Sequence, residues 1–150
     1  MFQVNRKDAG NRYIDAEGDY VVTLAKVEEN LDNKGREVCK LTFKAEDGAS
    51  VADRFINQES VWWRVNQLVA ATDHNVPDGT QVDFLGVKGS YANFLRAMIG
   101  LSLVVTLKFE EYQSNGETKR TLRIRNMKPV AGAKASDNDG GGGGDDEKPF

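Results

Sequence analysis

The strongest constraint on the fold is the strict alternation of apolar and polar residues in the segment VCKLTFK, residues 38–44. Cys39, Leu41 and Phe43 fall on one face of an extended chain, and the residues between them fall on the other. A period of two residues is the pattern of a β-strand with one buried face. The chain is therefore expected to build its core around a sheet.

Runs of β-type pattern on either side extend this strand into an antiparallel meander. Residues 20–27 precede it across a polar stretch, 29–37, which contains the Asn and Gly typical of a hairpin turn. Residues 51–57 follow after a second turn at 45–50. Three consecutive strands joined by short turns are expected to lie side by side.

The period changes after the third strand. The segment ESVWWRVNQLVAAT, residues 59–72, has apolar residues at helical spacing, and Ser60 is its candidate N-cap. Residues 73–91 are rich in Asp, Gly, Asn and Pro, which predicts a long excursion with one short strand at 81–87. Residues 92–100 predict a short helix closed by its final glycine.

Two more strands complete the pattern. Residues 101–112 and 118–127 alternate strongly, and the Asn-Gly pair between them favours a hairpin. Three strands, a helix and two strands form the order of the OB-fold, so we expect a mainly β protein built as a five-stranded OB-fold-like Greek-key barrel with a helix between strands 3 and 4. An SH3-like or other small barrel stays open, because periodicity does not establish strand pairing.

The composition changes after Pro129. The remaining residues are dominated by Ala, Gly, Ser, Asp and Asn, which cannot bury enough apolar surface to offset the entropy of ordering. We therefore expect one domain over residues 1–130 and a disordered, Gly-rich acidic tail over residues 131–150.

The net charge of −3 conceals an asymmetry. Five of the 23 acidic residues but only one of the 20 basic residues lie in 135–150, so residues 1–134 hold 19 basic and 18 acidic residues. Within that body, residues 118–134 contain six basic residues and no acid. A basic stretch beside an acidic tail is compatible with a nucleic-acid partner even though the whole-chain pI is about 5.2.

Outward strand positions supply the candidate contacts to such a partner. In an OB-fold the oligonucleotide groove lies between the loops that join strands 1–2 and 4–5, which are residues 28–37 and 111–118 here. Basic side chains at alternate positions neutralise phosphates and release counterions. The alternative interpretation is a merely solvated, lysine-rich strand face. The basic DNA-binding candidates are Lys34, Arg36, Lys40, Lys44, Arg54, Lys108, Lys119, Arg123 and Arg125.

Binding of single strands without sequence preference also needs rings on which bases stack. Tyr112, which opens the second loop, is the first candidate, and Trp63 at the helix edge is another. Phe55 is also a candidate, although the pattern leaves open whether Phe55 or Ile56 faces inward. Most aromatic residues in proteins belong to the core, and we assign three to the core of this protein: Phe43, Phe109 and Trp62.

The sequence offers little for catalysis, so we expect neither an enzyme nor a metal or cofactor. His74 is the one histidine, and Cys39, the one cysteine, is expected to be a small buried hydrophobe. The segment GVKGS, residues 86–90, lacks the frame of a Walker loop. A single cysteine and the lack of an apolar leader or membrane-length run predict a cytoplasmic protein.

The ending combines acidic residues with Pro-Phe, an apolar anchor that a pocket rimmed by Lys and Arg can capture. This ending, DDEKPF, resembles the acidic C-terminal tip of bacterial and phage single-stranded-DNA-binding proteins, with Lys148 where an apolar residue commonly stands. The resemblance implies recruitment of replication and recombination proteins by Asp145, Asp146, Glu147, Pro149 and Phe150.

The body resembles a different group. The segment AEGDYVVTLAKVEENLDNKGREVCKLTFK is similar to an uncharacterised phage family commonly found beside recombination genes, and the likeness spans residues 16–128. It implies a phage-borne protein that works in the cytoplasm of a bacterial host.

We therefore expect sequence-independent binding of single-stranded DNA in phage replication, recombination and repair. The alternative is a phage protein-interaction or structural barrel that binds no DNA and has a solubilising tail. An RNA binder would use the same groove physics, and a homo-oligomer is left open.

Overall fold

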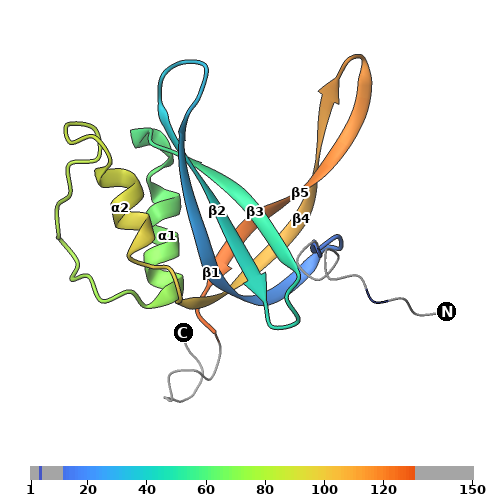
Figure 1. The fold of residues 1–150 in the computed structure, drawn as a ribbon, viewed down its shortest axis with the longest axis horizontal. Helices are drawn as coiled ribbons and strands as arrows, with labels where there is room; N and C mark the ends of the chain where they lie inside the picture. The colour runs from blue at the N-terminus through green and yellow to red at the C-terminus, as the bar shows by residue number, and fades with distance from the viewer. Residues whose placement is uncertain (1–3, 5–11, 131–150) are drawn as a thin grey trace.

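Five antiparallel strands form one sheet in the order β3-β2-β1-β4-β5 (Figure 1). The computed structural model describes residue 4 and residues 12–130. Its elements, in chain order, are β1 (Gly18–Leu31), β2 (Glu37–Ala45), β3 (Ser50–Ile56), the 3-10 helix η2 (Glu59–Val61), α1 (Trp63–Thr72), α2 (Ser90–Arg96), β4 (Ser102–Ser114) and β5 (Glu117–Lys128).

Strand β1 is long enough to organise the whole sheet. Its first part, Gly18 to Thr23, pairs with β4, and the part from Val22 onward pairs with β2. A bulge between Leu24 and Lys26 follows the last residues that pair with β4, and bulges bend and twist a strand locally. The bend carries β1 from one half of a barrel to the other, which is the arrangement of an OB-like fold.

The fold prediction is confirmed: the protein is mainly β, with five antiparallel strands and its helices between the third and fourth. The sheet is not closed, since no strand pairing joins β3 to β5 within the described residues. Both helices lie at one end of the sheet, away from the projecting β4–β5 hairpin (Figure 1). The predicted tail, residues 131–150, lies outside the described residues.

The alternation in β2 has the predicted consequence. Cys39, Leu41 and Phe43 are each 0% exposed and lie at the centre of the core. On β3 the ambiguous register is resolved, because Phe55 is buried and Ile56 is half-buried. The helices cover the core with these buried side chains: Val65, Leu68, Tyr91, Ala92 and Leu95.

Two local predictions in the middle of the chain are wrong. Residues 81–87 form no strand: residues 84–86 make a turn, in which Phe84 points into the core and the Gly86 N–H donates to Asp83 Oδ1 at 2.7 Å. Ser60 does not cap the helix, because it lies within η2, and α1 begins at Trp63 without a side-chain cap. In both places local sequence preference is overridden by tertiary packing.

The long insert is fastened to the barrel around Phe84. Asn57 donates to the Phe84 carbonyl oxygen at 2.8 Å and to Glu37 Oε1 at 3.0 Å, and it accepts from Trp62 Nε1 at 2.9 Å. The Phe84 ring makes edge contacts with three others: Trp62, Tyr91 and Phe94. A segment without regular structure is thus held by one buried ring and one buried amide.

Candidate nucleic-acid interface

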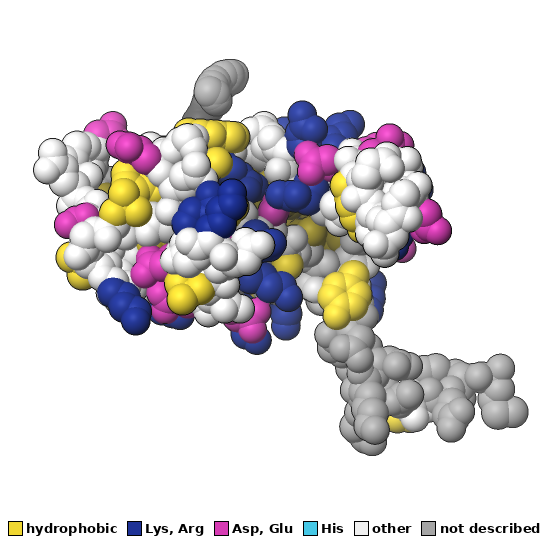
Figure 2. Space-filling view, turned by 90° about the horizontal axis from the view of Figure 1, so that it is seen from above, with side chains coloured by type: hydrophobic (Ala, Val, Ile, Leu, Met, Phe, Trp, Pro, Cys, Tyr) yellow, Lys and Arg dark blue, Asp and Glu magenta, His cyan; other side chains and the backbone are white. Residues whose placement is uncertain are grey.

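Two hairpins project from the same side of the sheet. One joins β1 to β2, and the other is the outer part of β4 and β5 (Figure 1). Because β4 pairs with β1 only as far as Leu107, residues 108–123 form a two-stranded extension, which we call the β4–β5 arm. Figure 2, which looks down onto this side, shows Lys and Arg side chains gathered in the hollow between the two hairpins. We call this hollow the inter-hairpin groove.

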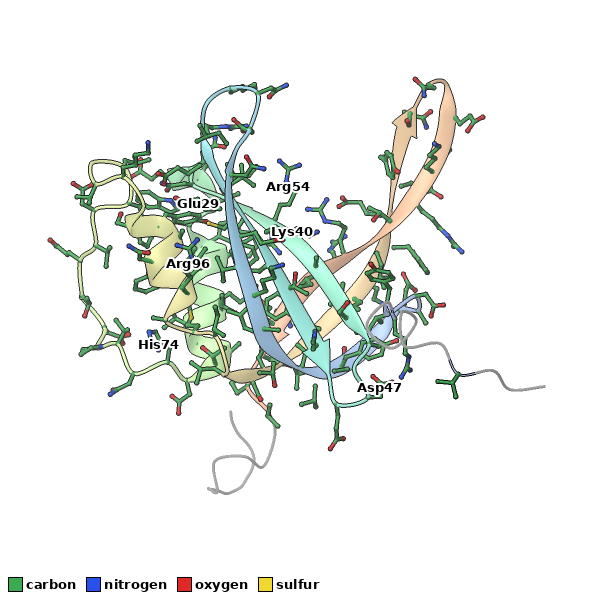
Figure 3. All side chains as sticks on the ribbon, viewed as in Figure 1. Glu29, Lys40, Asp47, Arg54, His74 and Arg96 are labelled. Carbon is green, nitrogen blue, oxygen red and sulfur yellow. The ribbon has the colours of Figure 1, made fainter. Side chains whose placement is uncertain are left out.

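The floor of the groove is the outward face of β2 and β3. Lys40 and Arg54 lie directly opposite each other in the ladder, both exposed, and Figure 3 shows them between the two hairpins. Neither side chain forms an ion pair within the described part of the chain. On its other side Lys40 lies opposite Glu28, whose carboxylate is bound to Lys26 at 3.1 Å. Like charges directly opposite in a sheet repel, so the pair Lys40 and Arg54 favours an anion above it.

The arm brings a ring and further cations to the groove. Tyr112 and Lys119 are cross-strand partners, and the alternation of side chains places them on the same ribbon face as Arg123. Arg123 Nη2 reaches Asp53 Oδ1 of β3 at 3.2 Å, so this ribbon face is turned toward β3. Tyr112 is 47% exposed and is available for stacking.

Asp53 is the residue that sequence reasoning missed. It is 5% exposed, and its carboxylate accepts hydrogen bonds from the Ile124 N–H at 3.3 Å and from Arg64 Nη2 at 3.2 Å. The signal was present, because Asp53 falls midway between Val51 and Phe55, two inward positions of β3. An acid at an inward strand position predicts buried cationic partners.

Arg36 has a structural role in the first hairpin. Its Nε donates to Asp32 Oδ2 at 2.8 Å and its Nη1 to Gln58 Oε1 at 2.7 Å, which ties the hairpin to the end of β3. The hydrogen bond from the Arg36 backbone N–H is the main cause of a lowered pKa of Asp32. Lys34, at the exposed tip of the same hairpin, donates its backbone N–H to Asp32 at 2.9 Å. Arg36 is therefore already engaged, whereas the Lys34 ammonium contacts no acceptor within residues 12–130.

The remaining basic candidates are spread along the sheet. Lys44 shares the outward face of β2 with Lys40 but lines a separate open pocket of about 810 Å³ with Tyr20 and Asp47. Lys108 lies opposite Arg123 at the base of the arm, and Arg125 is the extra residue of a bulge in β5. The structure therefore places Lys40 opposite Arg54 on the floor and Tyr112 opposite Lys119 on the arm, and Arg123 links the arm to β3.

The predicted aromatic residues also differ in whether they are exposed or buried. Phe55 is 2% exposed, and the Arg64 guanidinium lies 4.4 Å from its ring centroid, so its assignment as a stacking ring is wrong. Trp63 is 57% exposed at the start of α1. Phe109 lies outside the core, half-buried under Arg120 at 4.1 Å, because β4 continues past the barrel there. Phe43 and Trp62 belong to the core or pack against it.

Other kinds of site have less support in the described ranges. Among those residues no group of three or more His, Cys, Asp and Glu side chains is placed to hold a metal ion. Cys39 is buried as predicted, and desolvation raises the pKa of its thiol to about 11. His74 is half-buried, with its ring edge-on to Phe94. None of the helices in the described residues has the length and apolar character needed to cross a bilayer.

Comparison with protein-family models and with curated proteins gives no match for this chain. The functional interpretation therefore rests on the geometry of the groove. The predicted partner-binding residues of the tail, Asp145, Asp146, Glu147, Pro149 and Phe150, lie outside the described residues.

Proposed function

We propose that this protein binds single-stranded DNA without sequence preference in the inter-hairpin groove, and that it serves phage DNA replication, recombination and repair. The observation that carries the proposal is the pair Lys40 and Arg54, two exposed cations side by side without carboxylate partners in the described chain. Tyr112 and Lys119 on the facing arm add a ring and a third cation.

The chemistry of the groove favours an unpaired strand over a duplex. A base can stack on the exposed Tyr112 ring only when its own face is free, and such stacking contributes about 1–3 kcal/mol for each base. Lys40 and Arg54 then neutralise the adjoining phosphates, and the loss of counterions makes binding salt-dependent. Neither contact reads a base edge, so the affinity is expected to depend little on sequence.

Titration of the full chain with labelled poly-dT, duplex DNA and single-stranded RNA at two salt concentrations tests the proposal. Tight binding to poly-dT that weakens as salt rises supports it. Preference for the RNA would move the function to RNA binding through the same groove. Indifference to all three polymers would refute nucleic-acid binding.

The tail completes the proposal through its likeness to the tips of single-strand binders. Residues 145–150 combine acidic side chains with Pro149 and Phe150, which suits a partner pocket with basic rims. Removing the last six residues should leave poly-dT affinity equal or higher and abolish recruitment of replication or recombination proteins. A sharp fall in DNA affinity would contradict this division of roles.

One feature favours a protein-interaction barrel as the second candidate function. Leu85 and Val87 are 65% and 55% exposed, although Phe84 beside them is anchored in the core. Aliphatic side chains held outward from a fixed loop suit a protein partner. If poly-dT binding is absent and Leu85→Ser with Val87→Ser abolishes capture of a partner, this second function replaces the first.

A further inference from the structure

The gap between β3 and β5 is bridged by one side chain. These strands end the sheet, and within the described residues no ladder connects them. Asp53, on β3, occupies the gap with a side chain only 3% exposed. Its carboxylate contacts α1 through Arg64 and β5 through both Arg123 and the backbone of Ile124.

The four contacts of the Asp53 carboxylate come from three different elements. Oδ1 accepts a hydrogen bond from the Arg54 N–H at 2.7 Å and forms an ion pair with Arg123 Nη2 at 3.2 Å. Oδ2 accepts hydrogen bonds from Arg64 Nη2 at 3.2 Å and from the Ile124 N–H at 3.3 Å. Contacts of a buried carboxylate with two guanidinium groups are stronger than those with neutral partners. Asp53 therefore replaces the missing ladder at this point.

Arg123 extends this connection to the arm. Its Nη1 contacts Glu110 Oε1 at 3.3 Å while its Nη2 holds Asp53, so one guanidinium joins a carboxylate of the arm to a carboxylate of β3. Arg123 Nε is buried and has no hydrogen-bond partner among the residues that the structure describes. A buried donor without an acceptor is unfavourable, so this orientation of Arg123 is determined by its two carboxylates.

We propose that Asp53, acting through Arg123, is a positioning residue that fixes the β4–β5 arm opposite the groove floor. The arm lies beyond the barrel core, and this link holds its base so that Tyr112 and Lys119 face Lys40 and Arg54. An arm fixed before binding loses less conformational entropy when a strand enters. The consequence for DNA affinity rests on the proposed function, whereas the consequence for arm position does not.

The arm position can be measured without DNA. Spin labels on Asn33→Cys and Glu117→Cys report the distance between the two hairpin tips, and Cys39 takes no label because it is 0% exposed. We expect a narrow distance distribution in the parent and in Arg125→Met, and a broadened one in Asp53→Asn and Arg123→Met. Arg125→Met is the matched control, since it removes the same charge two residues away. Distributions that stay equally narrow in Arg123→Met would overturn the proposal.

Arg123→Met also keeps the proposal testable if Asp53→Asn does not fold, because Asp53 then retains Arg64 as its cation. In poly-dT binding, Arg123→Met should lose more affinity than Arg125→Met, by up to the loss seen in Tyr112→Ala with Lys119→Ala. This excess should vanish in the background of that double variant, which removes both groups that the arm positions, if Arg123 acts through the arm. An excess that persists there would mean direct contact with DNA and overturn the positioning role. If the parent binds no poly-dT, the proposed function fails. The label distances then still test whether Asp53 and Arg123 fix the position of the arm.

Discussion

The floor of the inter-hairpin groove and the arm that faces it both carry basic side chains, but they hold them differently. On the floor, Lys40 and Arg54 form no ion pair within the described chain. On the arm, Arg123 contacts two carboxylates and Arg120 lies over the Phe109 ring at 4.1 Å. The two cations of the floor are therefore free for a ligand, whereas Arg120 and Arg123 of the arm are committed to the fold.

The difference follows from what lies beneath each region. Under the floor, Leu41 and Phe43 are fully buried and the β2–β3 ladder is complete, so the outward side chains are not needed for stability. The arm extends beyond the pairing with β1 and has little core beneath it. A two-stranded ribbon alone is marginally stable, so its side chains take over the role of packing.

The largest expected effect comes from removing the free cations. Lys40→Ala with Arg54→Ala should weaken poly-dT binding about 100-fold at low salt, since a contact to a charged group contributes roughly 1.5 kcal/mol or more. The slope of log affinity against log salt should fall by about 1.4, for two phosphates on a single strand. Fluorescence titration at several salt concentrations measures both quantities.

A variant that removes two cations already engaged in ion pairs is the control for net charge. Arg12→Ala with Lys128→Ala removes two positive charges from exposed ion pairs with Asp47 and Asp19. We expect a loss of less than about fivefold, because screened surface charges act weakly at a distance. A loss equal to that of the floor variant would show that total charge matters and position does not.

The next effect concerns the ring on the arm. Tyr112→Ala should weaken poly-dT binding by about 5- to 150-fold, the equivalent of 1–3 kcal/mol for one stacked base. Tyr112→Phe keeps the ring and should bind within about twofold of the parent. Equal losses in both variants would assign the effect to the hydroxyl group and contradict stacking.

A smaller effect is expected from the acid on the arm. Glu110→Gln removes a half-exposed negative charge of the arm that repels the phosphates of a strand bound beside Tyr112, while Asp53 still holds Arg123. Poly-dT affinity should rise by about two- to fivefold, in line with the weak energies of exposed ion pairs. An unchanged affinity at low salt would show that Glu110 does not face the bound strand.

The order of strands and helices along the chain and the buried face of β2 were predictable because each depends on a local period. Alternation over residues 38–44 identified the core, and Asn-Gly placed the second hairpin. The same period gave the outward position of Lys40, whereas that of Arg54 depended on the register of β3, which the sequence left open between Phe55 and Ile56. It could not show whether these side chains form ion pairs, because that depends on residues far away in the chain.

What the sequence did not provide was the set of tertiary partners. Arg123 and Asp53 are distant in sequence and meet only because the sheet curves, so alternation alone presented Arg123 as a free cation. Phe84 is buried although no strand surrounds it. Alternation could not predict this burial, because the apolar neighbours Leu85 and Val87 are exposed. Periodicity determines the face on which a side chain lies, and packing determines what it touches there.

The last prediction tests the register on which the comparison depends. Cys39 and Lys40 lie in the part of β2 where buried and exposed residues alternate, so a buried thiol accompanies an outward ammonium at the next position. Because burial raises the pKa of the thiol to about 11, a thiol reagent at pH 8 should react with the unfolded chain and leave the native protein unmodified. The unfolded thiol loses its proton first as pH rises above its ordinary value near 9, so the free energy of unfolding should fall between pH 9 and 11. Rapid modification of native Cys39 would indicate that the register of β2 differs by one residue, which would turn Lys40 away from the groove.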